Sequence, residues 1–305
     1  MGSRFRLCGP AVAALVVALV VPSLAAPTPP GRDGLIAFVV VTPSGSTRGI
    51  AVVGPDGRGL RRLTTNTGDG SPAWSPKGRW LAFERAGIHI MKADGAGLKR
   101  LTRKGLDARE PTWSPDGHSI AFVSRDSLYV VRSDGRDVRR LVRSVDGALV
   151  AGPSWSPDGD SIAFALTEEY GGGHEYGSIV VVRRDGTGLR YLTDGGVISD
   201  DAGPGEWAED SDPDWSPDGT RILFTRRVWL CGQCDQNAIF SVDADGSDVG
   251  WVTTDTAFEA AKPAWAPSGT RFAADVNGGI AVLDPSGTRL RTVARSGTDP
   301  AWQPR

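Results

Sequence analysis

The densest group of potential metal ligands lies between Asp194 and Asp214, where the chain has eight acidic residues and no basic residue. Carboxylate oxygens are the donors that Ca²⁺ prefers, and Asp200, Asp201 and Asp210 are the candidate ligands. Their spacing does not match an EF-hand loop. We therefore interpret the stretch as a solvated acidic loop, a partner-binding patch or a calcium site, and we expect no other cofactor.

Two cysteines three positions apart, Cys231 and Cys234, form a second group with possible chemistry. In an exported protein such a pair is expected to close a local disulfide bond. A thioredoxin-like redox site would place the pair at the start of a helix beside a βαβ unit, and a zinc site would need a second pair. Neither pattern is present, so we expect the disulfide.

Residue types that act in catalysis are otherwise scattered. The three histidines, His89, His118 and His174, do not have metal-ligand spacing to one another. The chain has no Gly-x-Ser-x-Gly motif, which would mark the nucleophile of an α/β-hydrolase. The sequence therefore favours a protein that binds a partner or ligand over an enzyme.

These residues are carried by a repeat, first seen complete as P-A-W-S-P-K-G-R-W-L-A-F at residues 72–83. Related copies begin at Pro111, Pro153, Pro213 and Pro263, and a truncated copy, P-A-W-Q-P, begins at Pro300. Each copy contains a Pro-x-Trp strand, a tight turn, a second apolar strand and then two more strand patterns joined by a Gly-containing turn. A repeat of about 40 residues built from short strands is typical of a propeller.

The fold class predicted from this repeat is all-β: a six-bladed β-propeller with four-stranded antiparallel blades. Residues 34–41 have the pattern of a second strand whose Trp-bearing first strand is missing, and Asp299–Trp302 has the pattern of a first strand without a blade. We expect the C-terminal strand to join the N-terminal blade, which would close the ring and remove open sheet edges. The repeated tryptophans are expected to fill the gaps between adjacent blades.

The W-S-P-D-G repeats, followed by I-A-F and L-x-x-L-T strands, resemble the TolB-type propeller, a family with WD40-like repeats. The resemblance covers residues 34–305 and implies the propeller fold. TolB itself carries an additional N-terminal α/β domain, for which this chain is expected to have no room. The resemblance is therefore not extended to the TolB partnership with a peptidoglycan-associated lipoprotein.

The first 25 residues have the features of a signal peptide. Arg4 and Arg6 precede an apolar run at residues 11–21, and Ser23-Leu24-Ala25 has the small-x-small pattern of a cleavage site. We expect residues 1–25 to be the signal peptide, with a retained N-terminal anchor as the alternative. The protein would then be extracytoplasmic, secreted or periplasmic, with no membrane span after cleavage.

The remaining chain is expected to divide into a Pro-rich linker at residues 26–33 and the propeller at residues 34–305. Its formal net charge of -2 argues against a nucleic-acid-binding protein, which would present a basic surface. We expect a monomer.

In a propeller, the residues just before each first strand surround the mouth of the central channel. Here they have mixed charge, which is compatible with a ligand pocket, although they could also cap strand ends. These candidate binding residues are Asp69, Asp107, Arg109, Glu110, Asp212, Glu259, Lys262 and Asp299.

The longest loops are expected on the same face as these residues. They span residues 167–177, 194–212 and 226–237 and belong to the fourth and fifth blades. Because binding residues concentrate on variable loops of a rigid scaffold, we expect this face to bind a protein partner or a small ligand of the cell envelope. The alternative is a propeller enzyme, a polysaccharide lyase or hydrolase, that acts in the channel.

Basic pairs occur on the outermost strand of several repeats, at Arg61-Arg62, Lys99-Arg100 and Arg139-Arg140. We interpret them as charges that prevent edge-to-edge aggregation.

Overall fold

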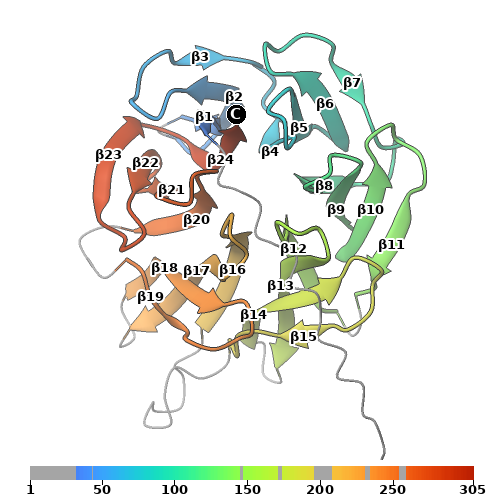
Figure 1. The fold of residues 1–305 in the computed structure, drawn as a ribbon, viewed down its shortest axis with the longest axis vertical. Helices are drawn as coiled ribbons and strands as arrows, with labels where there is room; N and C mark the ends of the chain where they lie inside the picture. The colour runs from blue at the N-terminus through green and yellow to red at the C-terminus, as the bar shows by residue number, and fades with distance from the viewer. Residues whose placement is uncertain are drawn as a thin grey trace, which may run out of the picture.

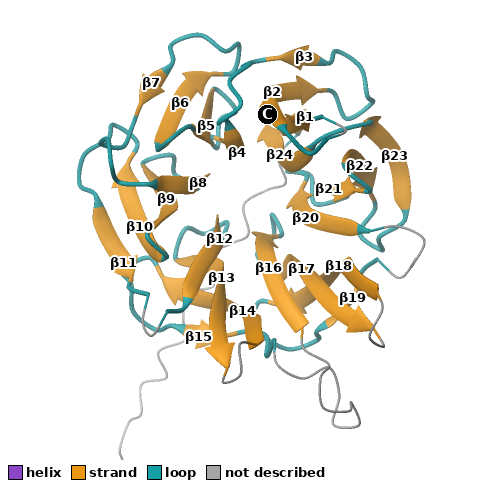
Figure 2. Cartoon of the chain, turned by 180° about the vertical axis from the view of Figure 1, so that it is seen from behind, coloured by secondary structure: helices purple, strands orange, loops and turns teal. Residues whose placement is uncertain are grey.

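The computed structural model describes residues 32–42, 44–144, 147–170, 174–195, 208–230, 234–253 and 259–305. All regular structure in these ranges is β-strand, arranged as antiparallel sheets around a central axis (Figures 1 and 2). Within the same ranges there is no helix that could cross a membrane. The expected signal peptide lies outside the described residues.

Four of the sheets have four strands each. The strands of each sheet are given in order from the axis outward. The first sheet contains β24 (Thr298–Pro304), β1 (Asp33–Val41), β2 (Thr47–Val53) and β3 (Arg61–Arg62), and the second contains β4 (Gly70–Trp74), β5 (Trp80–Glu84), β6 (Ile88–Lys92) and β7 (Lys99–Arg100). The third contains β8 (Ala108–Trp113), β9 (Ser119–Ser124), β10 (Ser127–Arg132) and β11 (Arg139–Val142), and the fourth contains β20 (Ala260–Trp265), β21 (Phe272–Val276), β22 (Gly279–Leu283) and β23 (Arg289–Ala294).

The fifth sheet has eight strands, where the repeat pattern predicts two separate blades. Its strands are β12 (Leu149–Trp155), β13 (Ser161–Tyr170), β14 (His174–Arg183), β15 (Arg190–Tyr191), β16 (Ala208–Trp215), β17 (Arg221–Leu230), β18 (Cys234–Asp243) and β19 (Gly250–Trp251). A single parallel pair, Gly177 with Glu209, joins β14 to β16. Gly177 permits this approach, because a Cβ there would lie 2.7 Å from the carbonyl oxygen of Asp210.

The second strand of each repeat is buried on both faces, because every sheet packs between two others. In β5, Leu81, Ala82 and Phe83 are all fully buried. The turn before this strand is held by its own polar side chains. In the repeat that begins at Pro111, the Ser114 hydroxyl donates to Asp116 at 2.6 Å and accepts from the Ser119 N–H at 2.9 Å. The W-S-P-D-G motif thus forms the tight strand connection that its residues predict.

Six clusters of buried side chains form the core, and each lies between two neighbouring repeats. Each cluster contains one repeat tryptophan or packs against one. Trp302, for example, packs with Ile36 of β1 and Ala273 of β21. The prediction that the tryptophans fill the gaps between blades is confirmed.

The two ends of the described chain lie in one sheet. The C-terminal strand β24 pairs antiparallel with β1, with Ile36 opposite Trp302. Asp33 at the start of β1 also reaches the preceding sheet, where Arg271 contacts it at 2.6 Å and the Ser268 N–H donates to it at 3.0 Å. The first sheet is therefore built from both ends of the chain.

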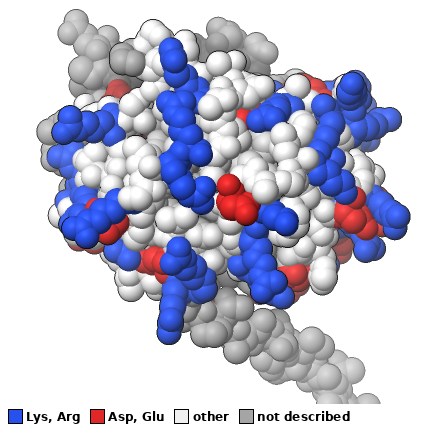
Figure 3. Space-filling model, turned by 90° about the horizontal axis from the view of Figure 1, so that it is seen from above, with Lys and Arg blue, Asp and Glu red and all other residues white. Residues whose placement is uncertain are grey.

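Basic side chains on the outermost strands make contacts that the sequence interpretation missed. The Arg61 guanidinium donates to the Ala93 carbonyl oxygen of the next repeat at 3.0 Å, and Arg139 donates to that of Arg184 at 2.7 Å. Arg190 and Arg291 make the same kind of bond to Ala244 and Asp56. These arginines therefore join adjacent sheets besides charging the edge. Figure 3 shows Lys and Arg side chains spread over the surface of the molecule seen from above.

Candidate binding site at the channel mouth

The first strand of every repeat begins with a bulge at the residue before its proline. The six residues at this position have φ angles between 46° and 58°: Ser71, Glu110, Gly152, Asp212, Lys262 and Asp299. The pairing register shifts at the same place, for example between Arg109 and Thr112. Such bulges redirect a side chain, and the following proline needs no ladder hydrogen bond there. The bulged positions therefore form a ring around the axis, which we call the bulge ring.

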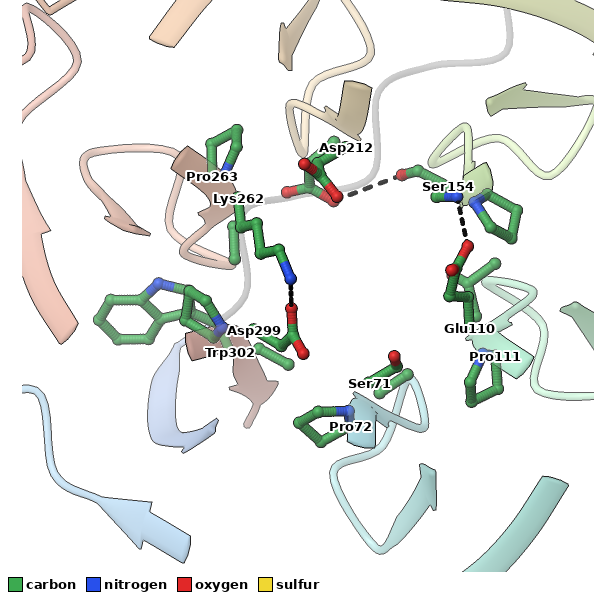
Figure 4. Close-up of a pocket in the computed structure, with 18 of the residues that line it drawn as sticks. Ser71, Pro72, Glu110, Pro111, Ser154, Asp212, Lys262, Pro263, Asp299 and Trp302 are labelled. Atoms are coloured by element: carbon green, nitrogen blue, oxygen red, sulfur yellow. Dashed lines mark hydrogen bonds and ion pairs between the residues drawn. The ribbon is translucent and has the colours of Figure 1, made fainter. Parts of the chain in front are cut away.

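All six residues of the bulge ring line one cavity at the centre of the molecule, with a volume of about 310 Å³ (Figure 4). The prolines that follow them line the same cavity, so apolar ring atoms alternate with polar side chains. A volume of this order is sufficient for a small ligand or a side chain of a partner.

One side of the bulge ring is an ion-paired group. The Lys262 ammonium contacts the Asp299 carboxylate, and Figure 4 shows the two side chains pointing toward each other. Burial acts to lower the pKa of Lys262, but the carboxylates of Asp299 and Asp212 outweigh it and raise that pKa. Burial raises the pKa of Asp212, although Lys262 opposes this shift. Lys262 is therefore a charged residue held between two carboxyl groups.

The opposite side of the bulge ring is acidic and is not neutralised by lysine. One carboxylate oxygen of Glu110 accepts from the Gly152 N–H at 2.7 Å, which satisfies the amide exposed by the bulge of the next repeat. Burial raises the pKa of Glu110, the Gly152 hydrogen bond and the charge of Arg109 oppose this shift, and the charges of Asp212 and Asp299 raise the pKa further. These couplings indicate that the three carboxyl groups face a shared space.

Asp214 lies two residues after Asp212 in the same cavity lining, directly before its repeat tryptophan, Trp215. Its carboxylate accepts from the backbone N–H of Trp265 in the next repeat at 2.7 Å and from the Ser154 hydroxyl of the preceding repeat at 3.3 Å. Burial raises the pKa of Asp214 to about 7. Asp214 therefore joins three repeats and titrates near neutrality, a role that its place in the acidic stretch did not reveal.

The structure brings four of the eight predicted rim residues to the cavity. Glu110, Asp212, Lys262 and Asp299 line it, whereas Asp107 and Glu259 are exposed and do not. The difference arises from the bulge: of the residues that precede each proline, only the one directly before it lines the cavity. Sequence reasoning missed Ser71, Gly152, Ser154 and Asp214, which the repeat alignment could have found by position.

The other two predicted rim residues form ion pairs outside the cavity lining. Asp69 is buried, and Arg85 binds both of its oxygens at 2.5 and 2.7 Å. Arg109 is partly exposed and pairs with Asp126 at 2.9 Å. Asp69 therefore has a structural partner within its own sheet.

The candidate calcium ligands are only partly within the described residues. Asp200 and Asp201 lie outside them, and both oxygens of Asp210 are bound by Arg226 at 2.6 and 2.7 Å. In the part of the chain that the structure describes, no group of three or more His, Cys, Asp or Glu side chains is arranged to hold a metal. A calcium site that includes Asp210 would have to break its ion pair.

The expected disulfide also lies outside the described residues, because Cys231 and the side chain of Cys234 are not among them. It stays a prediction.

Comparison with known proteins gives a family match for part of the repeats. Residues 70–204 match the PD40 family model, the TolB beta propeller domain. This part of the chain therefore carries TolB-type propeller repeats. No curated protein matched the chain.

Solved structures agree with this fold. TolB from Acinetobacter baumannii is 21% identical with a TM-score of 0.68, over 89% of this chain and 67% of that one. A TolB-like protein from Agrobacterium tumefaciens is also 21% identical, with a TM-score of 0.63 over 86% and 88%. Oligogalacturonate lyase from Vibrio parahaemolyticus is 12% identical, with a TM-score of 0.53 over 85% and 78%. At these identities the likeness concerns the fold alone.

Proposed function

We propose that this chain is an exported, non-enzymatic TolB-type propeller that binds a protein partner through the face bearing the bulge ring. The observation that carries the proposal is the ring itself. Six repeats each turn the residue before proline toward one cavity, and five of these residues are not glycine. A left-handed backbone at a residue other than glycine costs free energy, about 1 kcal/mol or more. A binding role for the cavity accounts for the repetition of this left-handed conformation around it.

The scaffold that this proposal requires is a closed ring of six four-stranded blades. In this ring the eight-stranded sheet would count as two blades, β12–β15 and β16–β19, since each half has its own W-S-P-D-G turn. Six cores between neighbouring repeats support this count, including the core that contains both Ile36 and Trp302. A ring of this kind would hold the bulge positions at fixed separations.

The fourth and fifth blades supply the rest of the proposed surface. The strands of β13–β14 and β17–β18 have ten residues each, against five or six in the hairpins of β5–β6 and β9–β10. The pairing of Leu149 with Thr167 shows that β13 continues past the start of β12, the end at which Gly152 is bulged. The two hairpins therefore extend on the side of the cavity mouth, where they could contact a partner.

Export is part of the proposal. It is supported by the basic and apolar pattern of residues 1–25 and by the TolB-type repeats. Expression from the full sequence, followed by detection of the protein outside the cytoplasm after cell fractionation, would check it.

The rival function is an enzyme that acts on polysaccharide in the channel. The lyase-like fold and a carboxyl group with a pKa of about 7 in the cavity favour it. Incubation with oligogalacturonate, followed by ultraviolet absorbance of the unsaturated product, would distinguish the two. We expect no product.

The proposed binding face is tested by chemical cross-linking in cell-envelope extracts. One variant reverses exposed charges at the mouth, Asp107→Arg with Glu259→Arg. The matched control reverses exposed charges in turns on the opposite face, Lys77→Glu with Asp160→Arg. We expect the first pair to reduce capture of a defined cross-linked partner at least fivefold and the second to leave it unchanged. Equal losses would refute the proposed face.

A further inference from the structure

The chemistry of the cavity wall restricts what part of a partner can enter it, if the proposed binding face is correct. One component of the wall is apolar: a proline from each repeat, namely Pro72, Pro111, Pro153, Pro213, Pro263 and Pro300. Their ring methylenes offer contacts to an aliphatic chain and no N–H donors. A purely charged ligand would leave this surface without a matching partner.

The second component is charged, and the charges do not balance. The lining contains four carboxyl groups, those of Glu110, Asp212, Asp214 and Asp299, and one ammonium group, that of Lys262. Lys262 is committed to Asp299 and lies close to Asp212. Glu110 lies across the cavity from this pair (Figure 4). The cavity lining therefore has a deficit of positive charge on its Glu110 side, where Arg109 acts on Glu110 from outside the lining and is already paired with Asp126.

We propose that the cavity receives a basic side chain, lysine or arginine, of a partner polypeptide. The aliphatic stem would lie against the prolines, and the cationic head would face Glu110 and Asp212. Snorkelling side chains of this type combine an apolar stem with a charged end, which matches the two components of the wall. The inference rests on the proposed function and specifies the chemistry of the group that is bound.

Other occupants fit the wall less well. An anionic group would face Glu110 and Asp212 with like charge. A neutral aliphatic group would leave these carboxylates desolvated without a counter-charge. A divalent metal would leave the proline surface unused, and one oxygen of Glu110 is already bound to the Gly152 N–H.

The test uses small probes of the side-chain chemistry with the full chain. n-Butylammonium and n-butylguanidinium represent the lysine and arginine ends, 1-butanol is the neutral equivalent, and methylammonium lacks the stem. Binding is followed by two-dimensional ¹H–¹⁵N NMR, using the amides of Glu110, Gly152, Asp212 and Lys262 as reporters. We expect both butyl cations to shift these amides, butanol to shift them at least tenfold more weakly, and methylammonium to bind more weakly than butylammonium.

Two matched variants identify the carboxylate that matters. Glu110→Gln keeps an oxygen that can accept from the Gly152 N–H but removes the charge. We expect this variant to bind n-butylammonium at least tenfold more weakly. Asp160→Asn is the same carboxylate-to-amide change at an exposed turn position on the opposite face, and we expect no effect. Unchanged melting temperatures would show that both variants remain folded.

A peptide comparison links the probes to a polypeptide partner. Capped pentapeptides that differ only in a central Lys, Arg, norleucine or Glu are titrated in the same way. We expect the Lys and Arg peptides to bind and the norleucine and Glu peptides to bind at least tenfold more weakly. Equal binding of the norleucine peptide, an unchanged affinity in Glu110→Gln, or preferential binding of CaCl₂ at the same amides would overturn the inference.

The outcome is separable from that of the proposed function. If partner capture depends on the mouth face but alkylammonium ions do not bind, only the inference about the basic side chain fails. If capture does not depend on the face, the proposed function fails, and binding of the cations in the cavity can still be measured.

Discussion

Asp214 is the residue whose environment differs most from what its type suggests. Its pKa in the folded state is about 7, above the value of 3.8 expected in an unfolded chain, because burial penalises its charge. The folded protein thus binds a proton that the unfolded chain has released between about pH 4 and pH 7. Linkage then requires the free energy of unfolding to fall as pH rises through this window, as far as this residue is concerned.

Asp214→Asn should remove that dependence, because the amide oxygen can still accept from the Trp265 N–H without carrying charge. We expect equal stability of variant and wild type near pH 4 and a gain of about 4 kcal/mol in the variant at pH 8, since one pKa unit corresponds to about 1.4 kcal/mol. Urea unfolding at pH 4, 6 and 8 measures the difference. A difference that does not change with pH would contradict the pKa shift.

Asp218→Asn is a control, because the pKa of Asp218 is shifted in the opposite direction to that of Asp214. Burial acts to raise the pKa of Asp218, but hydrogen bonds from Ser216 and Thr220 outweigh it and lower that pKa. Its carboxylate therefore stabilises the fold at pH values above the unfolded pKa, and this contribution is lost as pH falls. The control variant should lose more stability at pH 8 than at low pH.

At the scale of the elements, the outermost strands hold neighbouring sheets together. Arginines at one repeat position bond to a carbonyl oxygen in the next repeat, as Arg61 and Arg139 do. The equivalent position in β19 is Gly250, around which a Cβ would meet no heavy atom within 4 Å. That junction therefore has space for an arginine that the sequence does not supply.

Gly250→Arg should add the missing contact and stabilise the protein. Gly250→Ala is the control, since it also reduces the backbone entropy of the unfolded chain, an effect of about 0.5–1 kcal/mol. We expect the free energy of unfolding of the arginine variant to exceed that of the alanine variant by about 0.5 kcal/mol, the lower end of the range for a hydrogen bond. Denaturant unfolding of the three proteins measures this. Equal stability of the two variants would show that the rim arginines do not join the sheets.

At the scale of the whole molecule, the repeat alone predicted most of the fold. Trp74 and its five equivalents mark a strand, a turn and a buried gap between sheets, so their spacing conveys the architecture. The binding residues were less predictable. Asp69 and Glu110 both precede the Pro-x-Trp motif of their repeat, yet only Glu110 lines the cavity, because the bulge lies at its position. The repeat pattern also did not predict the pairing of β14 with β16, because this pairing depends on a single residue, Gly177.

The dependence of the ring on its last strand can be tested directly. Deleting residues 298–305 removes β24, exposes the β1 edge and takes Trp302 from the core that contains Ile36. Loss of a buried tryptophan alone costs about 3–5 kcal/mol, so we expect a fall in melting temperature of more than 10 °C or failure to fold. A synthetic peptide of residues 296–305 should restore the melting temperature in trans, and the same peptide with Trp302→Ala should not. A truncated protein that melts like the full chain would show that β24 is not needed to complete the first sheet, and the inferred six-bladed ring would lose its closing strand.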